Sequence, residues 1–289
     1  MGAENTLSAG WGQHGVGDGI SEKWITRARA GPTERRSVRA GLHMPLAAYY
    51  DSSADRGRQV VTLTGVAARC VIWESFERNW LGVLKSYSVP ALHMNKLMHF
   101  RGDFKAENGW NERRRSQFLG ELWNVIGSFR MQHLVAYSCS VLTDDWSRAR
   151  SDLPSLVSPE SMCVNFCVGG LHLPIECQGE SKPVLLYFDR NEQFMHKVNR
   201  VWVQQKKRSG TLFSQIRNIT AVDSTKYPIQ AADLLAWIEN KEARGEDYPF
   251  KAMLRLSRIL MIEHVICIYD YRHILLDYPN GRLKPQESR

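Results

Sequence analysis

The sequence lacks a long hydrophobic segment. Its longest apolar runs are interrupted by Arg or Glu well before the roughly 18 residues that a membrane-spanning helix needs, so we expect no membrane span. The N-terminus also lacks the charged start, apolar centre and small-residue cleavage site of a secretory signal peptide. With 43% hydrophobic and 24% charged residues in a chain of 289, the composition is that of a globular protein, which we expect to be cytoplasmic.

Cysteine is scarce and scattered, with six in the chain. Without a signal peptide, cysteines in a chain of this length indicate buried thiols in a reducing compartment. Cys163 and Cys167 lie four residues apart on an expected helix, but no second pair or nearby histidine completes a zinc site. Core packing is therefore the favoured role of this pair.

Residues 1–43 have few aliphatic residues and no hydrophobic periodicity, and they contain eight of the 21 glycines. The glycine-rich stretch at residues 10–19 lacks the GK[ST] ending of a phosphate-binding loop, so we assign it no nucleotide role. We predict a disordered leader here. Met44 directly precedes the first expected strand and is an alternative translation start; an inhibitory N-terminal arm is the other interpretation. Residues 279–289 are expected to be a loose polar tail.

Residues 44–278 are expected to form a single α/β domain. An opening hairpin is followed by alternating strands and helices, which indicates a mixed sheet flanked by helices. Residues 250–261 and 265–276 are expected to add extra C-terminal helices. Strands are expected at residues 46–50, 60–68, 132–142, 184–188 and 216–222, and helices at 71–85, 111–130, 158–169, 191–207 and 229–238.

Acidic residues are missing between Glu192 and Asp223. This basic window favours a surface that contacts the phosphates of RNA or DNA, and a solvated helix face followed by a basic loop is the equally weighted alternative. Its cations are Lys197, Arg200, Lys206, Lys207, Arg208 and Arg217.

Three carboxylates stand out. Asp51 and Asp189 each end an apolar strand, and Asp233 lies on a helix that is apolar nearly all round, with no Lys or Arg within six residues. A buried carboxylate needs a cation or several hydrogen-bond donors, so either a distant Arg or Lys or a metal must meet Asp233.

The three carboxylates are expected to converge. If the two strands are parallel neighbours, Asp51 and Asp189 lie about 5 Å apart, which is one strand spacing. Asp233 would complete an oxygen-rich site for Mg²⁺ or Mn²⁺, and such ions promote phosphodiester hydrolysis. Capping of a strand end is the alternative role of Asp51 and Asp189, and a salt bridge is that of Asp233.

Four further residues are candidates beside these carboxylates. Gln230 either orients a metal-bound water or Asp233, or bonds the preceding turn. Asp223 is a supporting acid or the cap of the turn through Lys226. His93 is a candidate general acid, with partial exposure on a loop as the alternative. Glu192 shares a helix start with Asp189, or acts only on the helix dipole.

Several short motifs follow one another in a fixed order along the chain. They comprise residues 92–93, 187–190 and 222–224, Pro228, and the Gln-x-x-Asp segment at 230–236. In these motifs, the chain resembles the domain of unknown function 3800 family over roughly residues 46–240. The resemblance implies a ribonuclease H-like mixed sheet and a metal-dependent, nuclease-like site at Asp51, Asp189 and Asp233.

The early motif departs from the family pattern. The family has Asp-Glu-Ser where this chain has Asp51-Ser52-Ser53, and a hydroxyl binds a hard cation more weakly than a carboxylate. Either one metal is lost, or Glu192 or Asp223 compensates, or activity is lost. The leading expectation is therefore a Mg²⁺- or Mn²⁺-dependent nuclease. The alternatives are a non-catalytic nucleic-acid-binding module and a subunit that binds another protein.

Overall fold

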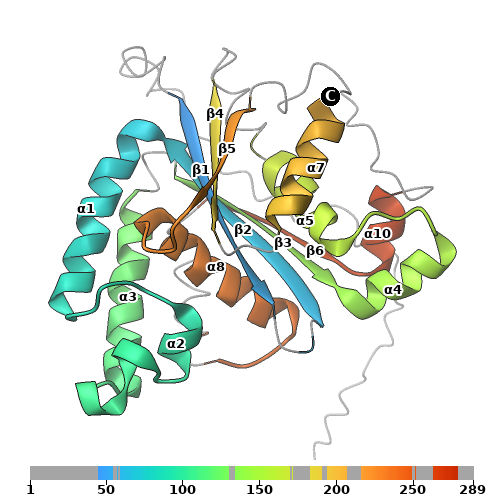
Figure 1. Cartoon of the computed structure of the whole chain (residues 1–289). Helices are drawn as coiled ribbons and strands as arrows, with labels where there is room; N and C mark the ends of the chain where they lie inside the picture. The colour runs from blue at the N-terminus through green and yellow to red at the C-terminus, as the bar shows by residue number, and fades with distance from the viewer. Residues whose placement is uncertain are drawn as a thin grey trace, which may run out of the picture. The chain divides into compact units, whose positions relative to one another are not determined.

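The computed structural model describes residues 45–54, 57, 59–129, 134–169, 171, 183–190, 194–206, 216–248, 251 and 263–278 (Figure 1). Within these residues, six strands form one mixed sheet in the order β5-β4-β1-β2-β3-β6. The expected leader at 1–43 and tail at 279–289 lie outside the described residues. The strands are β1 (Leu46–Ala54), β2 (Val60–Arg69), β3 (Val135–Leu142), β4 (Val184–Asp189), β5 (Ile216–Val222) and β6 (Glu263–Tyr269).

The sheet combines an antiparallel centre with parallel flanks. β1, β2 and β3 form an antiparallel meander. β4 pairs in parallel with β1, β5 with β4, and β6 with β3. The expected mixed α/β sheet flanked by helices is confirmed.

Helices cover both faces of the sheet (Figure 1). One face carries α1 (Cys70–Ser86), α2 (Met94–Met98), α3 (Glu112–Ser128) and α8 (Tyr227–Ala243). The other face carries α4 (Thr143–Asp152), α5 (Pro159–Gly169), α7 (Met195–Lys206) and α10 (Tyr271–Asp277). None of the helices in the described ranges is long and apolar enough to cross a membrane.

Side-chain alternation in β1 divides the core into two clusters. Tyr50 packs with Phe188 on the α5 face, at 4.7 Å between ring centroids, whereas Tyr49 packs with Tyr187 and Trp73 on the α1 face. Because successive strand residues point to opposite faces, each strand of the centre contributes to both clusters. The residues flanking Tyr50 along β1 therefore share the face of Tyr49.

The cysteine pair on α5 packs in the core, as expected. Cys163 and Cys167 are both fully buried, and their thiols lie against backbone carbonyls of β2 and β3. Burial also raises the pKa of Cys167 and of Cys139 well above the usual range of a thiol. These thiols therefore behave as small apolar groups.

The segment 265–276 differs from the helix expected there, whereas residues 250 and 252–261 of the other expected helix lie outside the described residues. Glu263–Tyr269 is the edge strand β6, and within 265–276 only the part from Tyr271 onward is helical. Val265, Cys267 and Tyr269 all face the same core cluster, which is the period of a strand and not of a helix. Helix α4 was also absent from the expected elements, because its sequence TDDWSRARSD is strongly polar and has few apolar residues to indicate a buried face.

Candidate functional site

Strand register places Asp51 next to Asp189. The last parallel pair between β1 and β4 is Tyr50 with Phe188, so the two aspartates occupy the next position on neighbouring strands. Both follow Tyr49 and Tyr187 by two residues, which puts all four on the face that carries α8. Asp189 is 9% exposed. Asp51 does not end its strand as expected, since β1 continues to Ala54 and pairs Asp51 with Thr64 of β2.

Helix α8 brings Asp233 close to Asp189. Burial raises the pKa of Asp233 to about 6, and the charge of Asp189 adds to the rise. The backbone N–H of Met94 donates to Asp233 Oδ2 at 2.9 Å, and this hydrogen bond opposes the rise in pKa. The negative charge of Asp189 therefore disfavours ionisation of Asp233.

Gln230 and Asp233 together hold the segment that leads into α2. Gln230 is 1% exposed, and its Oε1 accepts hydrogen bonds from Leu92 N at 2.9 Å and Trp80 Nε1 at 3.0 Å. Its Nε2 donates to Thr225 O at 3.1 Å, so the expected bond to the preceding turn is present. Asp233 accepts from Met94, two residues after Leu92. The Gln-x-x-Asp spacing of one helical turn thus matches two N–H groups of an extended segment.

His93 lies between the two anchored N–H groups. Burial and the charge of Lys96 lower its pKa, while Asp189, Asp103 and Asp223 oppose that shift. His93 is half-buried and is therefore mostly neutral near pH 7. His93 thus interacts electrostatically with Asp189, another of the residues predicted from the sequence.

Asp223 caps the turn before α8, which is the alternative role predicted for it from the sequence. Its Oδ1 accepts from Thr225 N at 2.9 Å, and this bond lowers its pKa together with the charges of Arg190 and His93. Asp223 is exposed. It contributes negative charge near His93 from the rim of the site.

The described residues do not form a complete metal cage. Within them, no group of three or more His, Cys, Asp or Glu side chains lies close enough together to hold a metal ion. Asp189 and Asp233 are brought together and Asp51 stands at the neighbouring register position. Glu192, the predicted supporting acid, lies outside the described residues.

Within the described residues, the cations of the basic window are divided between α7 and β5. α7, which carries Lys197 and Arg200, packs through Val198 and Val201 into the core cluster of the opposite face. Lys197 Nζ donates to Ser158 Oγ at 3.3 Å and lies 3.8 Å from Glu160, at the start of α5. Arg200 and Arg217 are exposed, Lys206 ends α7, and Lys207 and Arg208 lie outside the described residues.

Two cations near the site were not predicted. Arg190 follows Asp189 directly and acts on Asp223, and Lys226 precedes α8 and acts on Glu77 of α1. Both are exposed. Arg190 could have been predicted from its position directly after Asp189, and Lys226 from its position just before the predicted helix.

The stacked pair Tyr49 and Tyr187 was also missed, although each precedes its aspartate by two residues. Their ring centroids lie 4.7 Å apart with an interplanar angle of 15°. In contrast, the rings of Trp110 and Trp123 are buried in the core.

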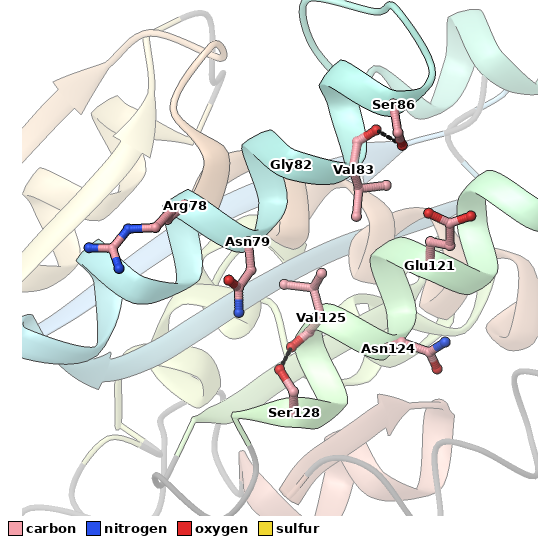
Figure 2. Close-up of a pocket in the computed structure, with 9 residues that line it drawn as sticks. All are labelled: Arg78, Asn79, Gly82, Val83, Ser86, Glu121, Asn124, Val125 and Ser128. Atoms are coloured by element: carbon pink, nitrogen blue, oxygen red, sulfur yellow. Dashed lines mark hydrogen bonds between the residues drawn. The ribbon is translucent and has the colours of Figure 1, made fainter.

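A separate groove of about 510 Å³ lies between α1 and α3 (Figure 2). The hydroxyls of Ser86 and Ser128 each donate to a carbonyl of their own helix, at 2.8 and 2.7 Å. Glu121 accepts from Tyr87 at 2.7 Å. These groups are engaged within the protein, so the groove brings together no set of catalytic side chains.

Comparison with models of known protein families finds no match for the chain, and comparison with curated proteins finds no similar sequence.

Proposed function

We propose that the protein is a divalent-metal-dependent hydrolase of nucleic-acid phosphodiesters. The observation that carries the proposal is the approach of Asp189 to Asp233 on the face where Asp51 also lies. The charge of Asp189 raises the pKa of Asp233, and a cation bound between the two carboxylates would offset this repulsion.

The donor set fits Mg²⁺ or Mn²⁺. Carboxylate oxygens are the ligands these hard ions prefer, and Mg²⁺ is commonly held by one or two carboxylates with water and substrate phosphate completing its shell. Asp189 and Asp233 would hold the ion, with Asp51 beside them. When bound, such an ion activates water and stabilises charge on phosphoryl oxygens.

His93 is assigned the role of a general base. Its lowered pKa leaves the imidazole mostly neutral near pH 7, and a neutral imidazole accepts a proton more readily than it donates one. The backbone hydrogen bonds of Leu92 and Met94 fix the segment on both sides of it. This replaces the general-acid role expected from the sequence.

The sheet supports a ribonuclease H-like assignment. The antiparallel meander β1-β2-β3 is continued by the parallel strands β4 and β5, and β6 is an addition at the other edge. In such a sheet, ligand sites gather at the carboxyl ends of the parallel strands, where Asp189 lies. The family resemblance rests on the sequence motifs.

A second candidate function is nucleic-acid binding without catalysis. The hydrogen bonds of Gln230 and Asp233 to Leu92 and Met94 account for the Gln-x-x-Asp motif structurally, with no reaction needed. Ser52 in place of the family's Glu removes one expected metal ligand. This candidate predicts salt-sensitive binding that does not respond to EDTA.

The test compares cleavage of labelled RNA and DNA in Mn²⁺ by the wild type and by Asp233→Asn. The Asn carbonyl oxygen still accepts from Met94 N, so the variant removes the charge while keeping the anchor. Because the metal supplies several kcal/mol of transition-state stabilisation, we expect cleavage to fall by at least about 100-fold.

Asp144→Asn is the matched control. Asp144 is exposed on α4, which packs on the opposite face of the sheet, so this variant loses an equal charge away from the site. We expect it to cleave like the wild type. Equal cleavage by the wild type and Asp233→Asn would contradict the assignment, and nucleic-acid binding with no cleavage by any of the proteins would favour the second candidate.

A further inference from the structure

The two stacked tyrosines follow the spacing of the sheet. Tyr49 on β1 and Tyr187 on β4 are paired in register, and their centroid separation of 4.7 Å equals the distance between neighbouring strands. Trp73 packs edge-on against Tyr49, at 4.9 Å and 75°. Tyr49 therefore contacts a second aromatic ring besides that of Tyr187.

The other end of the stack points toward β5. Thr220 is the register partner of Tyr187 on that strand, so it occupies the next position in the row Tyr49, Tyr187, Thr220. Thr220 is half-buried and carries no ring, and Asn218 beside it is exposed, with its Nδ2 donating to Thr220 Oγ1 at 2.9 Å. The helix on this face, α8, packs most closely on β1, β2 and β3. Thr220 therefore leaves the position after Tyr187 in this row without an aromatic ring of its own.

The row of rings runs beside the row of carboxylates. Two residues along the strands, or about 7 Å, separate Tyr187 from Asp189 on the same face. The exposed cations Arg190 and Lys226 lie at this end of the sheet and at the start of α8. An aromatic surface beside cations is the arrangement that binds single strands, because bases stack on the ring while phosphates meet the charges.

We propose that the outer face of Tyr187 is a stacking site for one base of a single-stranded nucleic acid, with the base above Thr220 and the Asn218 amide at its edge. This inference rests on the proposed function, because it brings the backbone of the same strand to Asp189. Double-stranded nucleic acid does not fit, since its bases are stacked on each other. The site thus selects unpaired substrate.

The test measures binding of short fluorescent single-stranded RNA and DNA by anisotropy, in EDTA so that binding is read without cleavage. Removing one stacking partner typically weakens binding by about 5- to 150-fold, so we expect a loss in this range for Tyr187→Ala. Tyr187→Phe keeps the ring and is expected to bind within about twofold of the wild type. Thr220→Leu fills the space above Thr220 and is expected to weaken binding while leaving both tyrosines intact.

The same oligonucleotides without bases provide the control for the backbone. We expect the wild type and Tyr187→Ala to bind them equally weakly, because stacking needs a base. Wild-type affinity in Tyr187→Ala and Thr220→Leu, equal losses in Tyr187→Ala and Tyr187→Phe, or no binding by the wild type would each overturn the stacking site. Failure of the proposed function is read separately, as an absence of cleavage in Mn²⁺.

Discussion

Asp233 is a residue whose charge opposes folding. Its pKa in the folded protein is raised from 3.8 to about 6, mainly by burial and further by Asp189. Ionisation is therefore harder in the native state than in the unfolded state, and the penalty is fully present above about pH 6 and absent below about pH 4. Residues that bind ions commonly carry such a cost in the absence of the ion.

Asp233→Asn removes this penalty and is expected to be more stable than the wild type at pH 8 in EDTA. The difference corresponds to the pKa shift and amounts to roughly 1 to 3 kcal/mol, reduced by solvent at this partly buried site. It is expected to vanish as the pH falls through 4. Urea unfolding at a series of pH values measures it, and a variant less stable than the wild type at pH 8 would show that Asp233 meets a cation of the protein itself.

The site residues were predictable from the sequence to different extents. Asp189 and Asp233 were found because a carboxylate on an apolar strand or helix is conspicuous. The partners of Gln230 were not, since Leu92 and Trp80 are 138 and 150 residues away in the chain and only the packed fold brings them together. Tyr49 and Tyr187 could have been predicted from the two-residue period of a strand, because each lies two residues before an aspartate and therefore on the same face of the sheet.

The central strands depend on a close approach at one position. Gly65 of β2 is the register partner of Tyr50 on β1, and a Cβ built on Gly65 would lie 2.1 Å from the tyrosine ring. The ring is fully buried, and its hydroxyl donates to Cys167 O on α5 at 3.3 Å. The ring therefore has little freedom to move away, and the spacing between β1, β2 and α5 requires glycine here.

Gly65→Ala is expected to cost roughly 1 to 3 kcal/mol of unfolding free energy, because it overpacks the core against a ring that cannot move away. Gly82→Ala is the matched control in the exposed middle of α1, where a Cβ meets nothing within 4 Å. It is expected to gain up to about 1 kcal/mol through helix propensity. Chemical denaturation of both variants checks this, and a neutral Gly65→Ala would mean that Tyr50 repacks.

The elements themselves were largely predictable. Hydrophobic period located β2, α1, α3, β4 and β5 to within a few residues, since each follows one pattern along its length. The prediction of a helix at 265–276 was wrong because the hydrophobic period changes at Asp270. This residue is the N-cap of α10, and its side chain accepts a hydrogen bond from His273 N at 2.9 Å. A short apolar segment that changes from strand to helix shows neither period clearly.

In the whole molecule, the site is assembled from β1, β4, α8 and the segment before α2, which are distant in sequence. An ion that binds only the assembled fold must stabilise it, by about 2.7 kcal/mol when its concentration is a hundredfold above the dissociation constant. We expect Mn²⁺ to raise the melting temperature of the wild type. Asp233→Asn and Asp189→Asn are expected to lose this response, whereas Asp144→Asn should keep it.

Differential scanning fluorimetry with Mn²⁺ and EDTA measures the response. A melting temperature that does not change with Mn²⁺ would remove the metal from the proposed function and favour binding without catalysis. The sequence indicated the members of this assembly but not their separations, because strand order and register decide which carboxylates become neighbours.

Strand β6 ties the end of the chain to an early element. It pairs with β3 along seven residue pairs, from Val135–Glu263 to Val141–Tyr269. While the ribosome is still making the intervening sequence, the hydrogen-bonding edge of β3 has no partner from β6 and is open to other strands. A nascent chain that stalls before residue 263 would therefore present an unpaired, aggregation-prone strand edge. Chaperones that shield such edges should contribute most to its folding during the last stage of synthesis.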